Sequence, residues 1–156
     1  MIVKLIPFIL LNSFMLVNGC ASGGGDIMQK NYLPQIIING EKIIPDTSMS
    51  IYFVGEIQKL LKDCDDYYEL IVDDGIIESI KKDKHYIEII YPELCSVETF
   101  KFNILKFDKV LVPLSGKFYS GEQVTFFTGF SGYNNTPVMN SQGRSGLEVI
   151  LNKIRQ

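Results

Sequence analysis

Alternation of apolar and polar residues constrains this chain more than any other feature of its sequence. Segments 85–91 and 99–107 alternate with a period of two, and 109–114 and 124–130 are further apolar segments of strand length. Successive side chains of a strand point to opposite faces, so this period predicts strands with one face more buried than the other. A sheet is therefore expected at the centre of the fold.

Three residues are expected to interrupt the apolar segments. Proline donates no backbone hydrogen bond, so Pro45 and Pro92 are predicted to end strands, and Pro113 to mark a strand end or an edge. Asp108 is predicted to supply a turn between the segments on either side of it.

The pair Asn39-Gly40 predicts a tight hairpin. It lies between the β-rich runs 35–38 and 41–44. A two-residue turn of this kind needs a positive φ at both central residues, which asparagine and glycine tolerate best. In such a turn Ile36 faces Ile43 across the two strands, and Ile38 faces Glu41.

Asp74-Gly75 is a second hairpin signal, and here two structures fit the sequence. The first is a hairpin in which a strand at 67–72 is followed by a returning strand at 76–80. The second is a short helix over 76–82, because Ile76, Ile77 and Ile80 also have helical spacing.

Helical spacing replaces alternation in two other segments. Residues 51–64 place an apolar stripe on one side, after capping side chains at 46–48. Near the C-terminus, Ser145 and Glu148 have the spacing of a capping box, in which each side chain bonds the other residue's backbone amide.

Together these segments predict an α+β fold. We expect a mostly antiparallel sheet of four to six strands, one helix after an N-terminal hairpin, and a short C-terminal helix, in two layers. The ten Phe and eight Tyr residues suggest that the second face of the sheet is not wholly solvated. This domain is expected to span residues 34–156.

The first twenty residues have a different character. Lys4 precedes an uncharged, largely apolar run from Leu5 to Val17, and 21–25 reads Ala-Ser-Gly-Gly-Gly. A membrane-spanning helix needs about 20 apolar residues, whereas about 10–14 suit the apolar core of a signal peptide. The run therefore predicts a secretion signal.

The end of this signal resembles the lipobox of bacterial lipoproteins. The residues are Leu16-Val17-Asn18-Gly19-Cys20: an aliphatic residue three before the cysteine, a small one directly before it, and a less usual Asn18 between. The resemblance implies cleavage before Cys20 and a diacylglyceryl group on its sulfur. It divides the chain into a signal at 1–19, a glycine-rich tether at 20–33 and the globular domain.

The lipobox also implies a location. Two or more acyl chains anchor a protein stably, so no spanning helix is needed. Ala21 and Ser22 follow Cys20 with no early aspartate, which by resemblance favours the outer over the inner membrane of the cell envelope. The side of the membrane that the domain faces stays open.

Cys64 and Cys95 remain once Cys20 is assigned to the lipid. Outside the cytoplasm such a pair can oxidise, so the sequence leaves open either a disulfide or two partly buried thiols. A metal site is not expected, because His85 is the single histidine and no Cys-x-x-Cys pair occurs.

The clearest set of titratable groups is acidic. Residues 63–78 contain Asp63, Asp65, Asp66, Glu69, Asp73, Asp74 and Glu78. The start resembles a calcium loop, but Tyr67 and Tyr68 occupy the places that need a ligand and a glycine. We interpret the cluster as a solvated helix end and turn, with an enzyme or metal site as the less favoured reading. The net charge of −3 gives no indication of nucleic-acid binding.

The segment 131–143 is the best sequence candidate for recognition. It is a long polar loop, and loops of this length are often functional. Its side chains are of the kind that make adaptable contacts with proteins. The candidate residues are Tyr133, Asn134, Asn135, Met139 and Asn140.

These observations favour a lipid-anchored envelope protein with a non-catalytic binding domain and no cofactor. Within that class we favour an inhibitor or immunity-type lipoprotein that acts on a protein partner. The alternative is a structural or assembly lipoprotein of an envelope complex.

Overall fold

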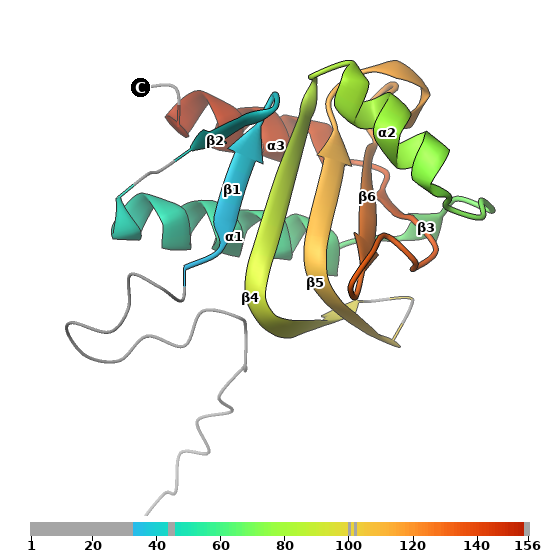
Figure 1. The fold of residues 1–156 in the computed structure, drawn as a ribbon, viewed down its shortest axis with the longest axis horizontal. Coiled ribbons are helices and arrows are strands. Elements are labelled where there is room, and N and C mark those ends of the chain that lie inside the picture. Colours follow the sequence, from blue (N-terminus) through green and yellow to red (C-terminus); the bar gives the residue numbers. More distant parts are fainter. Residues whose placement is uncertain (1–32, 44–45, 100, 102, 155–156) are drawn as a thin grey trace, which may run out of the picture.

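The computed structural model describes residues 33–43, 46–99, 101 and 103–154. The signal, the lipobox and most of the tether lie outside these residues, as does Pro45. The described part forms one antiparallel sheet of seven strands in the order β2-β1-β4-β5-β6-β7-β3 (Figure 1). The strands are β1 (Gln35–Ile38), β2 (Glu41–Ile43), β3 (Asp66–Tyr67), β4 (Tyr86–Thr99), β5 (Asn103–Pro113), β6 (Val124–Gly129) and β7 (Val138–Asn140). The helices are α1 (Thr47–Lys62), α2 (Asp74–Lys82) and α3 (Arg144–Ile154), with a 3-10 turn at Gly116–Phe118.

The first hairpin has the predicted turn and register. Asn39 has φ of 55° and Gly40 has φ of 84°. Ile36 faces Ile43 and Ile38 faces Glu41. The backbone preference of two turn residues thus sets the pairing of the two strands that they join.

The two central strands are longer than predicted. β4 continues through Pro92 to Thr99, and its pairing with β5 is irregular between Ile90 and Cys95. Pro92 has no backbone N–H to donate, but it lies in the irregular stretch, where the regular hydrogen bonds between the strands are already interrupted. The prediction that Pro92 ends the strand is therefore wrong. Thr99 closes a hairpin by facing Asn103, so the predicted strand 99–107 in fact begins at Asn103.

The predicted turn at Asp108 is also wrong. β5 is one strand from Asn103 to Pro113, and Asp108 lies within it. Its Oδ2 accepts a hydrogen bond from the backbone N of Ser131 at 3.1 Å, whereas its Oδ1 is buried with no hydrogen-bond partner among the described residues. Pro113 is the last residue of β5, as predicted.

The helices have capping residues that differ slightly from the prediction. Asp46 caps α1 by accepting a hydrogen bond from the backbone N of Met49 at 2.8 Å. The helix therefore begins at Thr47, four residues before the predicted start. α3 begins at Arg144, so Ser145 lies inside the helix and is not its capping residue.

The helices cover both faces of the sheet. α1 and α3 lie on one side and α2 lies on the other (Figure 1). We call these the α1–α3 face and the α2 face. The core of the α1–α3 face includes Phe53 and Ile57 of α1, Leu147 of α3, and Phe126 of β6. The smaller core of the α2 face contains Ile77, Ile80, Tyr86, Leu111, Phe118 and Phe127.

Residues 74–82 resolve the choice that the sequence left open. They form α2, and Asp73 caps it by accepting a hydrogen bond from the backbone N of Ile76 at 2.8 Å. The predicted hairpin at Asp74-Gly75 is wrong, and of the predicted strand 67–72 only Tyr67 lies in a strand, as the second residue of β3. The α+β class and the antiparallel sheet are confirmed. The sheet has seven strands in place of four to six, and a third helix covers its second face.

Candidate functional site

The acidic segment and the 131–143 loop, which lie far apart in the sequence, meet at one end of the sheet. After α1 the chain adds β3 as the terminal strand, beside β7 of the loop. Asp66 faces Met139 and Tyr67 faces Val138. The two sequence candidates for function therefore form a single structural unit. We call the outer side of β3, together with the chain that continues to Val72, the β3 edge.

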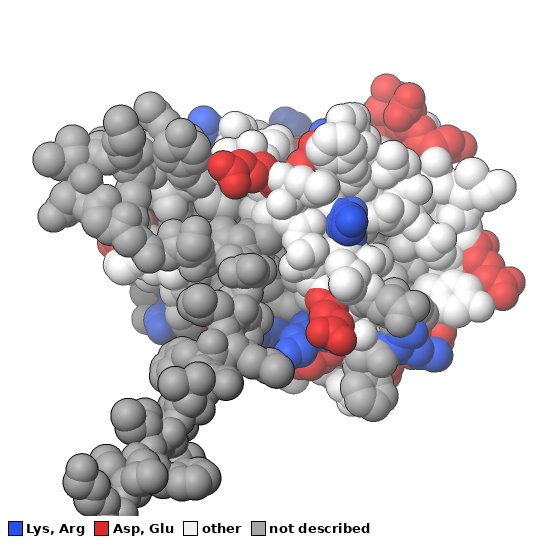
Figure 2. All heavy atoms as spheres, turned by 90° about the horizontal axis from the view of Figure 1, so that it is seen from below, with Lys and Arg blue, Asp and Glu red and all other residues white. Residues whose placement is uncertain are grey.

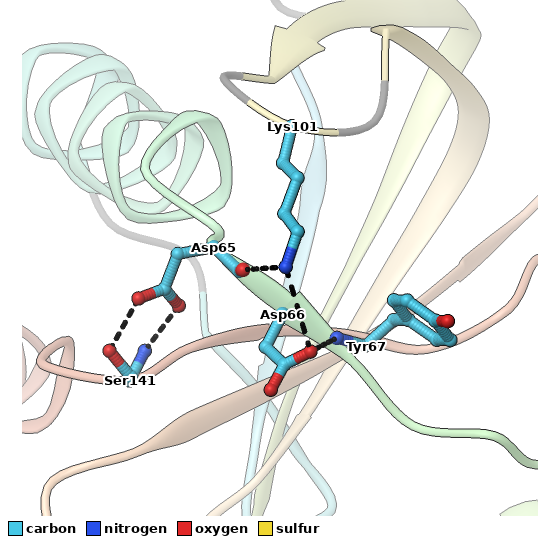
Figure 3. Close-up of polar contacts among 5 residues, drawn as sticks. All are labelled: Asp65, Asp66, Tyr67, Lys101 and Ser141. Atoms are coloured by element: carbon cyan, nitrogen blue, oxygen red, sulfur yellow. Dashed lines mark hydrogen bonds and ion pairs between the residues drawn. The ribbon is translucent and has the colours of Figure 1, made fainter.

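Asp65 joins the acidic segment to the loop. Its carboxylate accepts hydrogen bonds from the Ser141 hydroxyl at 2.5 Å and from the Ser141 backbone N at 3.0 Å (Figure 3). These bonds to the charged form lower the pKa of Asp65, with the hydroxyl as the larger cause. The carboxylate is therefore held as an anion in a structural role.

Lys101, from the connection between β4 and β5, reaches across to β3. Its Nζ donates a hydrogen bond to the backbone O of Asp65 at 2.9 Å and lies 4.0 Å from Asp66 Oδ1 (Figure 3). Asp66 Oδ1 also accepts a hydrogen bond from the backbone N of Tyr67 at 2.9 Å. Side chains thus bond one backbone group of the terminal strand, at Tyr67, and one of the residue directly before it, Asp65.

The β3 edge combines exposed apolar side chains with negative charge. Ile71 is 91% exposed and Tyr67 is 43% exposed. Residues 63–80 contain seven acidic and no basic residues. Seen from below, the described surface shows a largely uncharged area with acidic residues at its rim and basic residues both within it and beside them (Figure 2). Such a surface suits contact with a protein better than contact with an anionic ligand.

The asparagines of the recognition loop are bonded within the protein. Asn134 holds the backbone N and O of Phe130, each at 3.2 Å. Asn135 Nδ2 donates to the backbone O of Lys106 and to Thr128 Oγ1, each at 3.0 Å. Asn140 Nδ2 donates to the backbone O of Leu60 at 3.0 Å. These amides therefore fasten the loop to the sheet and to α1.

Met139 and the start of the loop are also packed within the fold. Met139 is half-buried on β7 opposite Asp66. The loop closes tightly on Gly129, because a Cβ there would lie 2.6 Å from the backbone N of Asn134. Part of the segment that was predicted to be a loop without regular structure is thus a strand, and the rest packs on itself.

A buried polar group on the α2 face was not predicted from the sequence. Glu88 of β4 is only 5% exposed. It accepts hydrogen bonds from Lys81 Nζ at 2.6 Å and from the Tyr133 hydroxyl at 2.5 Å. Burial, followed by the hydrogen bond to Glu88, raises the pKa of Tyr133. The sequence signal that could have revealed this group is the single carboxylate, Glu88, among the apolar residues 86–91.

Cys64 is a free cysteine, so the Cys64–Cys95 disulfide that the sequence left open is not formed. Cys64 is fully buried in the core of the α1–α3 face, and its Sγ lies 3.7 Å from the backbone O of Leu60. Burial raises the pKa of its thiol, followed by the charges of Asp65 and Asp63. The thiol is therefore protonated and shielded, which makes it a poor nucleophile.

The acidic residues of the described part of the chain form no cluster with the spacing of a metal site. Among the described residues, no three histidine, cysteine, aspartate or glutamate side chains could hold a metal ion together. A cavity of about 220 Å³ lies between α2 and the 3-10 turn, and its charged lining residues are Asp83 and Lys117. His85 is exposed just before β4. Four of the described carboxylates have a structural role: Asp46 and Asp73 cap helices, and Asp65 and Asp108 accept bonds from the 131–143 segment.

Comparison with models of protein families, with curated proteins and with solved structures finds no match. Within the described residues, no helix is long and apolar enough to cross a membrane.

Proposed function

We propose that this chain is a lipid-anchored protein of the bacterial cell envelope. The observation that carries the proposal is the segment Leu16–Cys20 at the end of the apolar run from Leu5. Lipid on Cys20 would hold the domain at the membrane surface, with residues up to 33 as the tether. The absence of an early aspartate after Cys20 favours the outer membrane.

We further propose that the domain binds a protein partner and performs no chemistry itself. This is supported by the structural use of its acidic side chains: Asp46 and Asp73 cap helices, and Asp65 fastens a loop. It is also supported by the exposed apolar side chains of the β3 edge. Inhibition of a toxin or a wall hydrolase, as in immunity-type lipoproteins, is the role that we favour.

The anchor is tested by replacing Cys20. The full chain is expressed in a diderm bacterium supplied with labelled palmitate, and membrane and soluble fractions are separated. Wild type is expected to incorporate label and to sediment with the membranes, whereas Cys20→Ala should lose the label and enter the soluble fraction. Cys64→Ala, which changes a buried cysteine of the domain, is the matched control and should behave as wild type.

Membrane retention of unlabelled Cys20→Ala would contradict the lipid anchor. Protein binding is tested separately, by capturing partners with wild type and Cys20→Ala after detergent extraction. Because the domain is unchanged, both proteins should capture the same partner. Failure of both to capture any protein would contradict the binding role and leave the anchor unaffected.

A further inference from the structure

The hairpin of β4 and β5 has one side that is covered and one that is open where the two strands approach their turn. On the covered side, Cys95 and Phe107 belong to the core of the α1–α3 face, and Leu105 packs against it. Because side chains alternate along a strand, Leu94 and Ile104 point to the other side. Leu94 is 53% exposed and Ile104 is 60% exposed. α2 lies over the opposite end of these strands, so among the described residues no helix covers this side of the hairpin (Figure 1).

A third exposed apolar side chain lies at the same end of the sheet. β6 ends where Gly129 faces Lys109 of β5, and Phe130, the next residue, is 56% exposed. Seven large apolar or aromatic side chains are exposed in the described part of the chain, and three of them therefore lie at this end. Single exposed apolar residues are ordinary on a protein surface, whereas a group of them indicates a contact with another apolar surface.

The exposed charges of this part of the hairpin balance. Glu93 and Glu98 of β4 are exposed, and so are Lys101 and Lys106. Figure 2 looks onto this end of the molecule and shows charges of both signs around a largely uncharged area. A strongly charged partner would find little net charge to bind here, so an apolar surface without strong charge is the better match.

The segment that carries the proposed lipid joins the domain toward this end. Gln35, the first residue of β1, faces Ile90 of β4, and β4 continues from Ile90 to Thr99 on the side where β1 begins (Figure 1). Residues 20–33 span at most about 50 Å when fully extended, which exceeds the roughly 30 Å of strand from Ile90 to Thr99. Lipid on Cys20 is therefore within reach of the membrane when this end of the sheet touches it.

We propose that the open side of the β4–β5 hairpin docks onto the surface of the membrane that holds the anchor, with Leu94, Ile104 and Phe130 in the interfacial layer of the lipid. This inference rests on the proposed anchor on Cys20 and adds an orientation of the domain. A few exposed apolar side chains bind a free bilayer weakly, but the anchor makes docking an intramolecular step at high effective concentration.

Tryptophan fluorescence tests the contact, because the chain contains no tryptophan. The chain with lipid on Cys20 is reconstituted into phosphatidylcholine vesicles with or without bromine on the acyl chains, since bromine quenches a tryptophan that it touches. Ile104→Trp should lose most of its emission in the brominated vesicles. His85→Trp, exposed at the other end of β4, is the matched control and should emit equally in both.

A second substitution locates the contact. Leu94→Asp, added to Ile104→Trp, puts a charge on the docking side and should shift the docking equilibrium about tenfold or more toward the undocked domain, which restores emission. Val149→Asp on α3, where the side chain is 63% exposed, is the control and should leave the quenching unchanged. All of these proteins should sediment with the vesicles, because the anchor is the same.

Equal emission of Ile104→Trp in the two kinds of vesicle, in protein that sediments with them, would overturn docking while the anchor stands. Absence of lipid on Cys20 would contradict the anchor and this orientation together. Blue-shifted emission of Ile104→Trp in the Cys20→Ala protein without vesicles would show that this chain or a second copy already covers the open side. Loss of partner capture by Leu94→Asp after detergent extraction would assign that side to a protein. Either result would overturn the lipid surface as the occupant.

Discussion

The two faces of the sheet are covered in different ways. On the α1–α3 face, nineteen of the described residues form a buried core; all are apolar, tyrosine or cysteine, and they come from α1, α3 and most of the strands. On the α2 face the described core has six buried residues beside a short helix, and the buried Glu88 next to them bonds the half-buried Lys81 and Tyr133. The first face is held by apolar area, and the second depends on a few directed polar bonds.

We therefore expect the α1–α3 face to be the more stable part of the molecule and the α2 face to be the part that opens more easily. Segments that bind partners are commonly drawn from the less stable parts of a fold. Here α2 belongs to the thinner layer, and Tyr68 and Tyr133 pack against its core. The α1–α3 face then serves as the support.

The largest expected effect is a difference in the free energy of unfolding between substitutions at two adjacent residues, one on each face of the sheet. Phe126 and Phe127 are both 0% exposed, but Phe126 belongs to the core of the α1–α3 face and Phe127 to that of the α2 face. Phe126→Ala should lower the free energy of unfolding by about 4 kcal/mol, and Phe127→Ala by about 3 kcal/mol, because the thinner layer can collapse into the space. Urea unfolding measures both, and an equal or larger loss for Phe127→Ala would contradict the comparison.

The next largest effect is a fall in the free energy of unfolding at alkaline pH, caused by the buried thiol of Cys64. Its pKa is raised in the folded state, so its contribution is complete below the unfolded pKa of about 8.5 and is lost as pH rises above it. Stability should therefore fall by about 2 kcal/mol between about pH 8 and pH 10 from this residue. Urea unfolding at several pH values should show a flatter profile for Cys64→Ala; an unchanged slope would show that the thiol is not responsible.

A smaller effect is expected at the polar group of the α2 face. Tyr133→Phe removes one of two hydrogen bonds to the buried Glu88 and should lower the free energy of unfolding by about 1–2 kcal/mol. Lys81→Met removes the other bond, and the double variant should show coupling because both side chains bond the same carboxylate. Additive losses in a double-mutant cycle would mean that the two bonds act independently.

The smallest effect compares the caps of two helices. Asp46→Ala at α1 and Asp73→Ala at α2 each remove a carboxylate that accepts a backbone hydrogen bond. Loss at α1 should lower the midpoint of global unfolding, since α1 supports the larger core. Loss at α2 should mainly increase local opening, with little change in that midpoint. A larger midpoint shift for Asp73→Ala would reverse the assignment of the faces.

The sequence predicts the structure correctly where one local rule decides it. Asn39 and Gly40 supply the two positive φ values that a tight hairpin requires, so the turn and its register followed directly. The stripe of 51–64 and the spacing of the last segment likewise predicted the helices that form α1 and α3. These are short-range patterns, and nothing distant in the fold opposes them.

The predictions from the sequence are wrong where residues distant in the sequence determine the local structure. Pro92 sits inside β4 because the pairing with β5 becomes irregular around it, which no single segment reveals. Of the strand predicted at 67–72 only Tyr67 pairs, because its neighbour β7 is just three residues long. Glu88 was not identified because its two partners come from α2 and from the 131–143 loop.

The candidate site shows the same limit. The sequence drew attention to the acidic segment and to the loop, but not to their meeting at β3. The loop asparagines were predicted to face a partner, and the structure instead uses them to hold the loop in place. Side chains suited to adaptable recognition are equally suited to fastening a turn, and only the fold distinguishes these uses.

Native-state hydrogen exchange tests most directly the claim that the α1–α3 face holds the fold while the α2 face opens locally. Amides in the middle of α1, such as that of Ile57, should exchange only through global unfolding and follow its denaturant dependence. The amide of Ile80 in α2 should exchange with a smaller free energy and a weaker denaturant dependence, as expected for local opening. Equal free energies and equal denaturant dependences at the two sites would show that both faces open as one unit, and would contradict the claim.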